Sequence, residues 1–354
     1  MSSSNKFKGA IIGFGFISGK GHFPAYQERR DTEIVAVADV CEARRQAALK
    51  VDPRLRVYES AEALFEGEKE LDFVDISTPP VFHAQIAMMA LKRGLHVLCE
   101  KPLTATLAEA HELLLAAKDL KRVVFPCHNY KHAPVVKTVD EIIASGEIGT
   151  VHGLTLNTYR NTHAKGVTEW QTDWRRDKKY SGGGIAMDHG SHTFYLTFNW
   201  LKSLPTSVTA KMVKISRDWD TEDNFSCVLT FPTGYANAHL TWTAGVRKVI
   251  YTIQGSQGAV TIDDDDVQVY SAKAGDGRGA TRRFSVTSHW GDASHVQWFN
   301  SMFDQFLGCV KQGDFVNSEL KEAYHCVQLI TRAYESSNNG SRETELDTSF
   351  AFLN

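Results

Sequence analysis

The sequence predicts an α/β fold in which an N-terminal domain built on a parallel sheet precedes a second domain that is rich in strands. In residues 1 to about 126, short apolar runs alternate with amphipathic stretches of helical period, which is typical of βαβ units. Further along the chain, strand-like runs repeat between turns that contain Gly or Pro. A chain of 354 residues is also long enough to bury two cores.

The composition is that of a globular protein without a strong charge bias. Lys and Arg number 39 against 42 Asp and Glu, so the net charge of -3 gives no field that recruits nucleic acid or an anionic membrane. No apolar run approaches the roughly 20 residues of a membrane helix, and the first residues lack the apolar core of a secretory signal. We therefore expect a cytoplasmic protein that recognises a small molecule locally. Six cysteines without a CxxC pair favour reduced, buried thiols.

The first strand, expected at residues 8–12, leads into a glycine-rich turn and then into a helix at about residues 22–28. The turn reads GFGFISG, with Ser18 in the place of the third glycine of a G-x-G-x-x-G pattern. Glycines in this context let a pyrophosphate approach the backbone N–H groups at the start of a helix. The pattern predicts a dinucleotide site that includes Gly13, Gly15, Phe16 and Ile17, and an ordinary turn is the alternative.

A second strand, expected at residues 33–38, ends at Asp39, which lies 24 residues after Gly15. An acid in this place binds the ribose hydroxyls of NAD and repels the 2'-phosphate of NADP. Arg44 and Arg45 follow one turn later and keep NADP as an alternative cofactor. Asp39 and Glu42 also have the spacing of a capping box, so a helix cap is the competing role for Asp39.

The alternation continues through the rest of the first domain. We expect helices at residues 42–49, after Ser60, at 81–93 and at 107–120, and strands at 73–76, 96–99 and 123–127. Ser77, Thr78 and Pro79 end one of these strands and His83 lies in the first turn of the next helix, so these residues face the edge of the sheet where ligands bind. For His83 a structural cap is the competing role.

The stretch VLCEKPLT at residues 97–104 organises the predicted site. A buried strand ends there in Glu100, Lys101 and Pro102, and proline cannot continue a strand ladder. A lysine delivered to the carboxyl edge of a parallel sheet is a candidate for chemistry. A surface ion pair between Glu100 and Lys101 is the alternative.

Five motifs occur in order along nearly the whole chain. They are Gly13-Phe14-Gly15, Thr78-Pro79-Pro80 with His83, Glu100-Lys101-Pro102, Gly146-Glu147-Ile148-Gly149, and Gly182-Gly183-Gly184 followed by Asp188 and His192. In this order they resemble the glucose-fructose oxidoreductase, inositol dehydrogenase and rhizopine-catabolism (Gfo/Idh/MocA) family of NAD(P)-dependent oxidoreductases.

The resemblance implies a Rossmann domain over residues 1–126 and an α+β domain over residues 127–354 with a large open, mostly antiparallel sheet. The last helix is a candidate to pack back on the first domain. Family members pair through the open sheet, so a homodimer or homotetramer is expected. The resemblance also places Lys101, Asp188 and His192 in the catalytic triplet, and Asn129 near the nicotinamide.

A polar and aromatic segment at residues 159–179 is longer than a simple connection requires, and such loops are functional or mobile. Its candidate substrate-binding residues are Tyr159, His163, Trp174 and Arg175. A tryptophan face stacks on a sugar ring, and a guanidinium binds a substrate oxygen or the cofactor. Core packing of a tryptophan and a surface role for Arg175 are the alternatives.

Three glycines at residues 182–184 permit a backbone to approach a ligand closely before a helix that begins near Ile185. Asp188 and His192 lie four residues apart, one turn from each other on one helical face. A carboxylate beside an imidazole can orient it, favour its protonated form and hold a substrate hydroxyl. With Lys101 they are expected both to catalyse and to bind substrate, and a surface pair is the alternative.

The rest of the second domain is expected to supply structure. We expect helices at residues 134–145, 296–311 and 319–336, strands at 151–158, 208–213, 224–231, 235–242, 248–254 and 259–262, and a flexible hairpin tip at 275–279. No metal is predicted, because His128 and His132 have ligand spacing without a third and fourth ligand. The acidic residues 263–266 lack the spacing of a calcium loop and are expected to form a solvated turn.

The predicted function is hydride transfer between the nicotinamide C4 and a secondary alcohol or carbonyl carbon of a sugar, polyol or related carbohydrate. In oxidation His192 takes the hydroxyl proton, Asp188 orients His192 or the substrate, and Lys101 stabilises the charge that develops on the oxygen. One alternative is an NAD-dependent glycosidase that oxidises C3 transiently and then eliminates. Another is an inactive cofactor-binding sensor or regulator, which predicts a degraded triplet.

Overall fold

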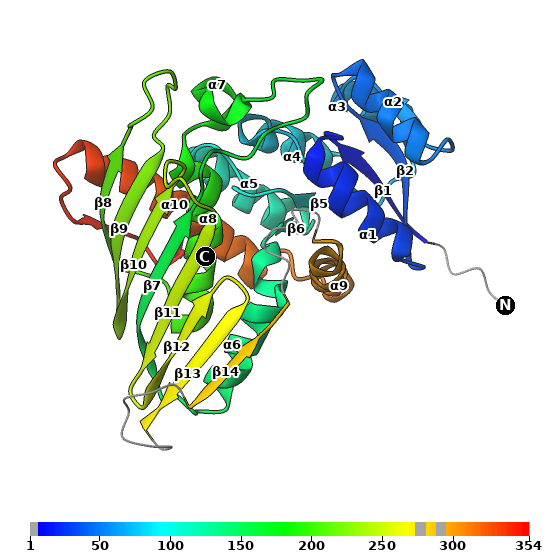
Figure 1. Ribbon diagram of the computed structural model, residues 1–354. Helices are drawn as coiled ribbons and strands as arrows, with labels where there is room; N and C mark the ends of the chain where they lie inside the picture. Colours follow the sequence, from blue (N-terminus) through cyan, green and yellow to red (C-terminus); the bar gives the residue numbers. More distant parts are fainter. Residues whose placement is uncertain (1–5, 273–280, 288–294, 354) are drawn as a thin grey trace.

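The computed structural model describes residues 6–272, 281–287 and 295–353, which form two sheets that each carry their own helices (Figure 1). The first sheet and its helices, drawn in blue and cyan, lie beside the second sheet, which is drawn in green and yellow. Both predicted fold classes are therefore confirmed, a parallel α/β sheet and a mostly antiparallel sheet.

The first sheet has six parallel strands in the order β3-β2-β1-β4-β5-β6. The strands are β1 (Phe7–Ile12), β2 (Thr32–Ala38), β3 (Arg56–Tyr58), β4 (Phe73–Ile76), β5 (His96–Cys99) and β6 (Val124–Pro126). The helices between them are α1 (Phe23–Glu28), α2 (Glu42–Val51), α3 (Ala61–Gly67), α4 (His83–Lys92) and α5 (Leu107–Leu120). The order changes direction between β1 and β4, which is the switch point where such sheets bind ligands.

Local sequence explains these elements. All four residues of β4 are buried, as a central strand covered on both faces requires. The Ser60 side chain accepts a hydrogen bond from the Ala63 N–H at the start of α3, and Thr106 and Glu109 form a capping box at the start of α5. The predicted elements of this domain are confirmed, and two features were not predicted: the short edge strand β3 and one turn of π-helix (η1, Ser18–His22) before α1.

The second sheet has nine strands in the order β14-β13-β12-β11-β7-β10-β9-β8-β15. They are β7 (Val151–Tyr159), β8 (Ser207–Val213), β9 (Asn224–Phe231), β10 (Gly234–Thr241), β11 (Lys248–Gly255), β12 (Gly258–Asp263), β13 (Asp266–Ser271), β14 (Arg282–Ser285) and β15 (Thr344–Glu345). Neighbouring strands are antiparallel except β7 and β10, which are parallel.

Helices cover one face of this sheet and leave the other open. Helices α6 (Pro134–Ala144), α8 (Ile185–Leu201) and α10 (Ser318–Asn338) share one apolar core with the inward residues of the strands. On the other face Val228 is 45%, Tyr235 41% and Ile250 36% exposed. Strand β9 alternates buried and exposed residues along its length, as a sheet covered on one side requires.

The last part of the chain returns to the first domain. In helix α9 (Val296–Gln312), Phe299, Phe303 and Phe306 pack into the same core as β1 and α1. Helix α10 contacts α5 and β6 on one side and α8 and β8 on the other. The two sheets are therefore joined by shared helices as well as by the chain between them, which makes the space between the domains a well-defined place for a site.

The remaining predicted features agree with the structure only in part. Strands β13, β14 and β15 were not predicted, because they are short or polar. Residues 263–266 form the turn between β12 and β13, as expected, whereas the hairpin tip predicted at 275–279 lies outside the described residues. The six cysteines are free and four of them are buried. In the described part of the chain, no helix has both the length and the apolar character that a bilayer crossing needs.

Candidate active site

A cleft of about 810 Å³ lies between the two domains, at the carboxyl ends of the strands of the first sheet. The first domain contributes the glycine turn and the turns after β2, β4 and β5, and the second contributes residues 164–175 and the first turns of α8. The site residues expected from the sequence that line it are Gly13, Gly15, Phe16, Ile17, Asp39, Ser77, Thr78, Pro79, Glu100, Lys101, Asn129, Trp174, Arg175, Asp188 and His192.

The glycine turn presents backbone to the cleft. Gly13 has a φ of +93°, and a Cβ there would lie 2.8 Å from the Ser77 backbone, so only glycine fits. A Cβ on Gly15 would meet nothing within 4 Å, so there is open space beside this residue. Ser18 Oγ donates to Gly13 O at 2.7 Å. The serine in the third glycine position therefore braces the turn.

Asp39 stands at the end of β2 and is fixed by two backbone hydrogen bonds. Its Oδ2 accepts from the Phe14 N–H at 2.7 Å and its Oδ1 from the Cys41 N–H at 2.8 Å. Burial raises the pKa of Asp39, although these bonds and the nearby arginines oppose the shift. Cys41 is the N-cap residue of α2 and no side chain caps this helix, so the capping-box alternative for Asp39 is wrong.

The two arginines after Asp39 are bound within the protein. Arg44 Nε donates to Phe14 O at 2.8 Å, and its Nη1 lies 3.3 Å from Glu169 Oε1. Arg45 Nη1 donates to Asp39 O at 2.8 Å. Glu169 belongs to the segment before α8, so the Arg44–Glu169 ion pair joins the two domains at this end of the cleft.

His83 supports the wall of the cleft from behind. It is fully buried, and its ring nitrogens lie 2.7 Å from Thr78 O and 2.9 Å from Pro102 O. It therefore ties the turn after β4 to the turn after β5, instead of contacting the cofactor as predicted, because its ring points into the domain. Thr78 Oγ1 is buried and has no hydrogen-bond partner among the described residues.

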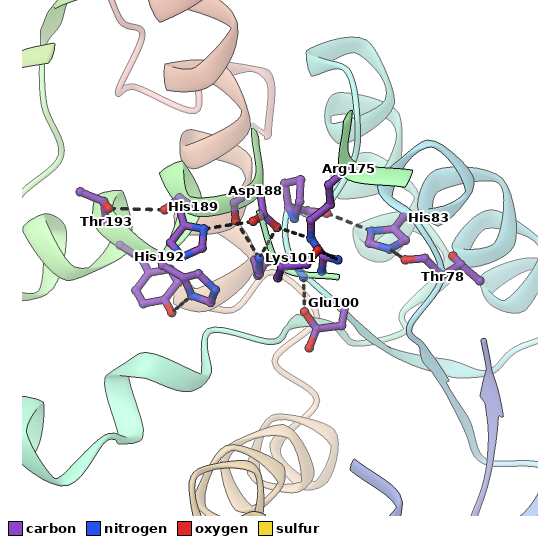
Figure 2. A network of polar contacts seen from close by, with 12 residues as sticks. Thr78, His83, Glu100, Lys101, Arg175, Asp188, His189, His192 and Thr193 are labelled. Carbon is purple, nitrogen blue, oxygen red and sulfur yellow. Dashed lines mark hydrogen bonds and ion pairs between the residues drawn. The ribbon is translucent and has the colours of Figure 1, made fainter. Parts of the chain in front are cut away.

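Lys101 reaches from the end of β5 to the first turn of α8 (Figure 2). Its Nζ donates to Asp188 O at 2.7 Å and lies 3.5 Å from Asp188 Oδ1. The Lys101 side chain is 12% exposed and that of Asp188 10%, so little water separates them. A lysine from the first domain and an aspartate from the second thus meet at one end of the cleft.

The Asp188 carboxylate is shared among three neighbours. Arg175 Nε donates to Oδ1 at 3.0 Å, and His189 Nδ1 lies 3.0 Å from Oδ2 (Figure 2). Burial raises the pKa of Asp188, but Lys101, Arg175 and His189 outweigh burial and hold this pKa well below its usual range. Burial lowers the pKa of His189 to about 4, although Asp188 opposes the shift. Asp188 is therefore an anion that holds the surrounding donors in place.

Tyr195 holds the ring of His192. His192 Nδ1 lies 2.6 Å from Tyr195 Oη, which also accepts from the Tyr130 N–H at 3.2 Å. The Tyr130 ring stacks on His192 with 3.9 Å between centroids. Burial, Lys101 and His189 hold the pKa of His192 well below its usual range. Asp188 raises this pKa as expected, but burial, Lys101 and His189 outweigh it, so the ring is neutral near neutral pH, and Tyr195 orients it.

The segment before α8 supplies only part of the expected substrate site. Arg175 lies over Trp174 at 4.2 Å from the ring centroid and donates to Ala164 O at 3.1 Å, and both residues line the cleft. Tyr159 ends strand β7 with its ring against His239. His163 is buried between Trp219 and Trp242. Contrary to the prediction, Tyr159 therefore belongs to the sheet and His163 to the interior of the segment.

The three glycines before α8 approach protein and not a ligand, which corrects another expectation. A Cβ on Gly184 would lie 1.8 Å from Glu222 O, and one on Gly183 would lie 2.2 Å from Tyr334 Oη. Glu222 accepts hydrogen bonds from the N–H groups of Gly184 and Ala186, both at 3.0 Å. The close approach lets this carboxylate cap the N-terminus of α8, and so fixes Asp188 one turn later.

Sequence reasoning missed four groups that shape the site. His189 and Tyr195 were detectable, because they adjoin Asp188 or follow His192 by one helical turn. Tyr130 follows the predicted Asn129 directly, but nothing in the sequence shows that its ring stacks on His192. The pair of His22 and Asp75, which lies behind Glu100, had no signal because 53 residues separate its members.

Two clusters of side chains have the spacing of metal ligands, but their surroundings disfavour a metal ion. Ligand atoms of His128, Glu319 and Glu322 lie close together, yet Lys131 Nζ bonds Glu319 at 2.8 Å and Glu322 at 2.5 Å and so takes the place of a cation. His22, Glu100 and Cys127 also lie close together. There, burial raises the pKa of the Cys127 thiol well above its usual value, which disfavours the thiolate a metal needs.

Comparisons with known proteins match both domains. Residues 7–128 match the GFO_IDH_MocA family model, described as an oxidoreductase family with an NAD-binding Rossmann fold, and residues 136–261 match the GFO/IDH/MocA C-terminal domain. D-glucoside 3-dehydrogenase of Escherichia coli (strain K12) is 30% identical over 96% of this chain and 98% of that protein. D-xylose 1-dehydrogenase (NADP(+)) 2 of Haloferax volcanii is 28% identical over 95% and 99%. The structure of levoglucosan dehydrogenase with NADH and levoglucosan has a TM-score of 0.85 at 20% identity, over 97% of this chain and 100% of that chain.

The residues of the cleft fit NAD, the cofactor in the description of the matched N-terminal domain. The open space at Gly15 leaves room for a pyrophosphate against the backbone. The Asp39 carboxylate ends β2 where ribose hydroxyls bind, and the unpartnered Thr78 Oγ1 offers a hydrogen bond further along. Asp39 follows β2 and Lys101 follows β5, with β1 and β4 between these strands, so the nicotinamide would lie away from Asp39, near Lys101, Asp188 and His192.

Proposed function

Because the chain belongs to the GFO/IDH/MocA family of oxidoreductases, we propose that it is an NAD-dependent dehydrogenase or reductase of a carbohydrate. Its reaction transfers a hydride between the nicotinamide ring and a secondary alcohol or carbonyl carbon of a sugar or polyol. One observation carries the proposal: Lys101 Nζ meets Asp188 at 2.7 Å across the domain boundary, one helical turn from His192 and in the same cleft as the glycine turn.

The protein groups hold the reacting oxygen and move its proton, and bound NAD accepts or supplies the hydride. His192 is neutral near neutral pH, so it accepts the hydroxyl proton of an alcohol in oxidation. Lys101 donates a hydrogen bond to the same oxygen and stabilises the negative charge that develops there. Asp188 positions Lys101 and Arg175, and Tyr195 orients His192. In reduction, His192 or Lys101 supplies the proton.

The substrate class follows from relatives that act on sugars by name. One relative that spans nearly both whole chains, at 30% identity, is a D-glucoside 3-dehydrogenase, so the C3 hydroxyl of a glucoside is the first position to test. The guanidinium of Arg175 covers one face of the Trp174 ring. On that side we expect the sugar hydroxyls to contact the guanidinium of Arg175, because the indole face itself is not accessible. Tyr159 and His163 are not part of this proposal.

The test mixes the protein with NAD or NADP and a panel of glucosides, free sugars and polyols, and follows both NADH absorbance and products. We expect NADH to form with NAD and at least one sugar. The Lys101→Ala variant should bind NAD with near-normal affinity and lose turnover by about a thousandfold. Full activity in this variant would refute the proposed role of Lys101.

The same assay separates the alternatives. An NAD-dependent glycosidase would release sugar from a glycoside without net formation of NADH. The favouring observation is again the relative named for oxidation at C3, the position where such a cycle begins. A sensor would bind NAD and sugar without turnover, but it has no use for the intact contact between Lys101 and Asp188.

The remaining proposals concern cofactor choice, assembly and location. Asp39 favours NAD over NADP, because its carboxylate repels a 2'-phosphate and both following arginines are bound within the protein. The open face of the second sheet, with Val228, Tyr235 and Ile250 exposed, is the surface where a second copy would pair to give a dimer or tetramer. We also propose a cytoplasmic location, and the charge balance supports a protein without nucleic acid or an anionic membrane as a partner.

A further inference from the structure

The π-helical turn η1 places a histidine behind the nicotinamide end of the cleft. Such turns are rare and concentrate at functional sites. His22 ends this turn and is fully buried, with its ring 4.1 Å between centroids from Phe299 of helix α9. The proposed reaction does not use this residue, whose side chain has no exposed surface.

His22 joins two carboxylates from neighbouring strands. Its Nδ1 lies 2.7 Å from Asp75 Oδ2 on β4, and its Nε2 lies 3.1 Å from Glu100 Oε1 after β5. Asp75 also accepts hydrogen bonds from Tyr26 Oη at 3.0 Å and from Ser77 Oγ at 3.1 Å. The chain from Asp75 through His22 to Glu100 is therefore a continuous buried network with few ways to rearrange.

The network places one imidazole between two carboxyl groups. Burial lowers the pKa of His22, but Asp75 and Glu100 outweigh burial and raise it to about 9, so the ring is a cation near neutral pH. Burial raises the pKa of Glu100, but His22 and Lys101 outweigh it and lower this pKa. An ion network buried behind a ligand cleft is costly relative to an apolar core, so stability alone does not account for it.

Glu100 is the member of the network that reaches the cleft. It lines the cleft next to Lys101, and its Oε2 accepts from the Lys101 N–H at 3.1 Å (Figure 2). Lys101 Nζ itself turns to Asp188. A carboxylate held from behind by a buried cation thus faces the end of the cleft where the nicotinamide ring would lie. That ring is a cation when oxidised and neutral when reduced, so a nearby negative charge strengthens the binding of the oxidised form relative to the reduced form.

We propose that Glu100, positioned by the buried His22–Asp75 pair, makes the cleft bind NAD+ more tightly relative to NADH than it would without this charge. Glu100 acts on the ring directly, and His22 and Asp75 are positioning residues that act through Glu100. The effect stabilises the oxidised cofactor on the protein. The inference rests on the proposed function, because it takes the nicotinamide to lie at the Lys101 end of the cleft.

The experiment measures the dissociation constants of NAD+ and NADH separately, by quenching of tryptophan fluorescence from Trp170 and Trp174 in the cleft and by calorimetry. In the Glu100→Gln variant, which keeps the shape of the side chain, the ratio of the NAD+ constant to the NADH constant should rise about fivefold or more. In His22→Gln the same ratio should instead fall, because this variant removes the buried cation and leaves the negative charge of Glu100 without it.

Asp39→Asn is the matched control, because it removes a carboxylate from the opposite end of the cleft. The adenosine half is identical in NAD+ and NADH, so this variant should weaken both and keep their ratio within about twofold. If Glu100→Gln has the same ratio of NAD+ to NADH dissociation constants as the wild-type protein, the inference is wrong. If His22→Gln does not fold, the result for Glu100→Gln is sufficient to test the inference. Binding of neither form by the wild-type protein would instead remove the proposed function on which the inference rests.

Discussion

The two walls of the cleft differ in the charge of their histidines: one wall holds a cation and the other holds neutral rings. On the wall from the first domain, His22 lies between Asp75 and Glu100, and its pKa is raised to about 9. On the wall from the second domain, His189 and His192 have lowered pKa values, about 4 for His189 and well below the usual range for His192. His22 and His192 are both buried and the His189 side chain is only 13% exposed, so burial alone does not decide their charge.

The charged neighbours make the difference. Burial lowers the pKa of each ring, but two carboxylates bind His22 directly, one at each ring nitrogen. His192 instead faces the cation Lys101 and the second imidazole His189, and the carboxylate that opposes them, Asp188, also binds Lys101 and Arg175. The first wall therefore carries fixed charges that act on the cofactor, and the second carries a neutral base that can accept a proton.

The largest expected effect is on the second wall, at Asp188. The Asp188→Asn variant removes the negative charge beside Lys101, Arg175 and His189, although Lys101 keeps its hydrogen bond to the backbone oxygen of residue 188. We expect kcat/KM to fall by about a thousandfold while NAD still binds. Steady-state kinetics with a sugar substrate and NAD titration measure the two effects.

Asp173→Asn is the control for this prediction. Asp173 also bonds a histidine, His163, but it is 47% exposed and belongs to the outer part of the segment. This variant should retain most of the wild-type activity. If Asp188→Asn keeps activity within about tenfold of wild type, the second wall does not depend on its anion and the comparison fails.

The sequence predicted the residues of the second wall better than the buried contacts of the first wall. Asp188 and His192 lie one helical turn apart and Lys101 follows a strand end, so local rules bring them to the cleft. His22 bonds Asp75 and Glu100, which are 53 and 78 residues away, and only the order of β1, β4 and β5 in the sheet makes these carboxylates neighbours. Spacing carries no information about such contacts.

The segment before α8 shows the same limit within the second domain. Trp174 and Arg175 were predicted at the cleft and line it, but Tyr159 and His163 do not. His163 faces inward because Trp219 and Trp242, from segments that follow α8, form its surroundings. Strand and helix periods fix which residues point to a site, whereas a long loop is fixed by contacts that the sequence does not reveal.

The next effect concerns stability and the first wall. The pKa of His22 is about 9 in the folded protein and 6.5 in the unfolded chain, so its stabilising contribution is fully present below pH 6.5 and is lost as pH rises through 9. Between pH 6.5 and 9.5, wild type should lose about 3 kcal/mol more unfolding free energy than His22→Gln. Urea unfolding of both proteins at the two pH values measures this difference.

His152→Gln is the control, because His152 is exposed on β7 and has neither carboxylate partner. It should show the same pH dependence of the unfolding free energy as wild type. If His22→Gln also follows the wild-type pH dependence, His22 is not a cation in the folded protein, and the contrast between the two walls disappears.

The smallest effect sharpens the contrast on the second wall, through the pH dependence of sugar oxidation. His192 must be neutral to accept the hydroxyl proton, and its lowered pKa keeps it neutral below pH 6.5. At saturating NAD and substrate, kcat should therefore change less than about twofold between pH 7.5 and 5.5, whereas a base with the ordinary pKa of about 6.5 would lose about tenfold.

Protein held at pH 5.5 and then assayed at pH 7.5 controls for acid inactivation. A tenfold loss centred near pH 6.5 in protein that recovers fully would show that His192 gains its proton as easily as an exposed histidine, and that Lys101 and burial do not set the charge of this wall.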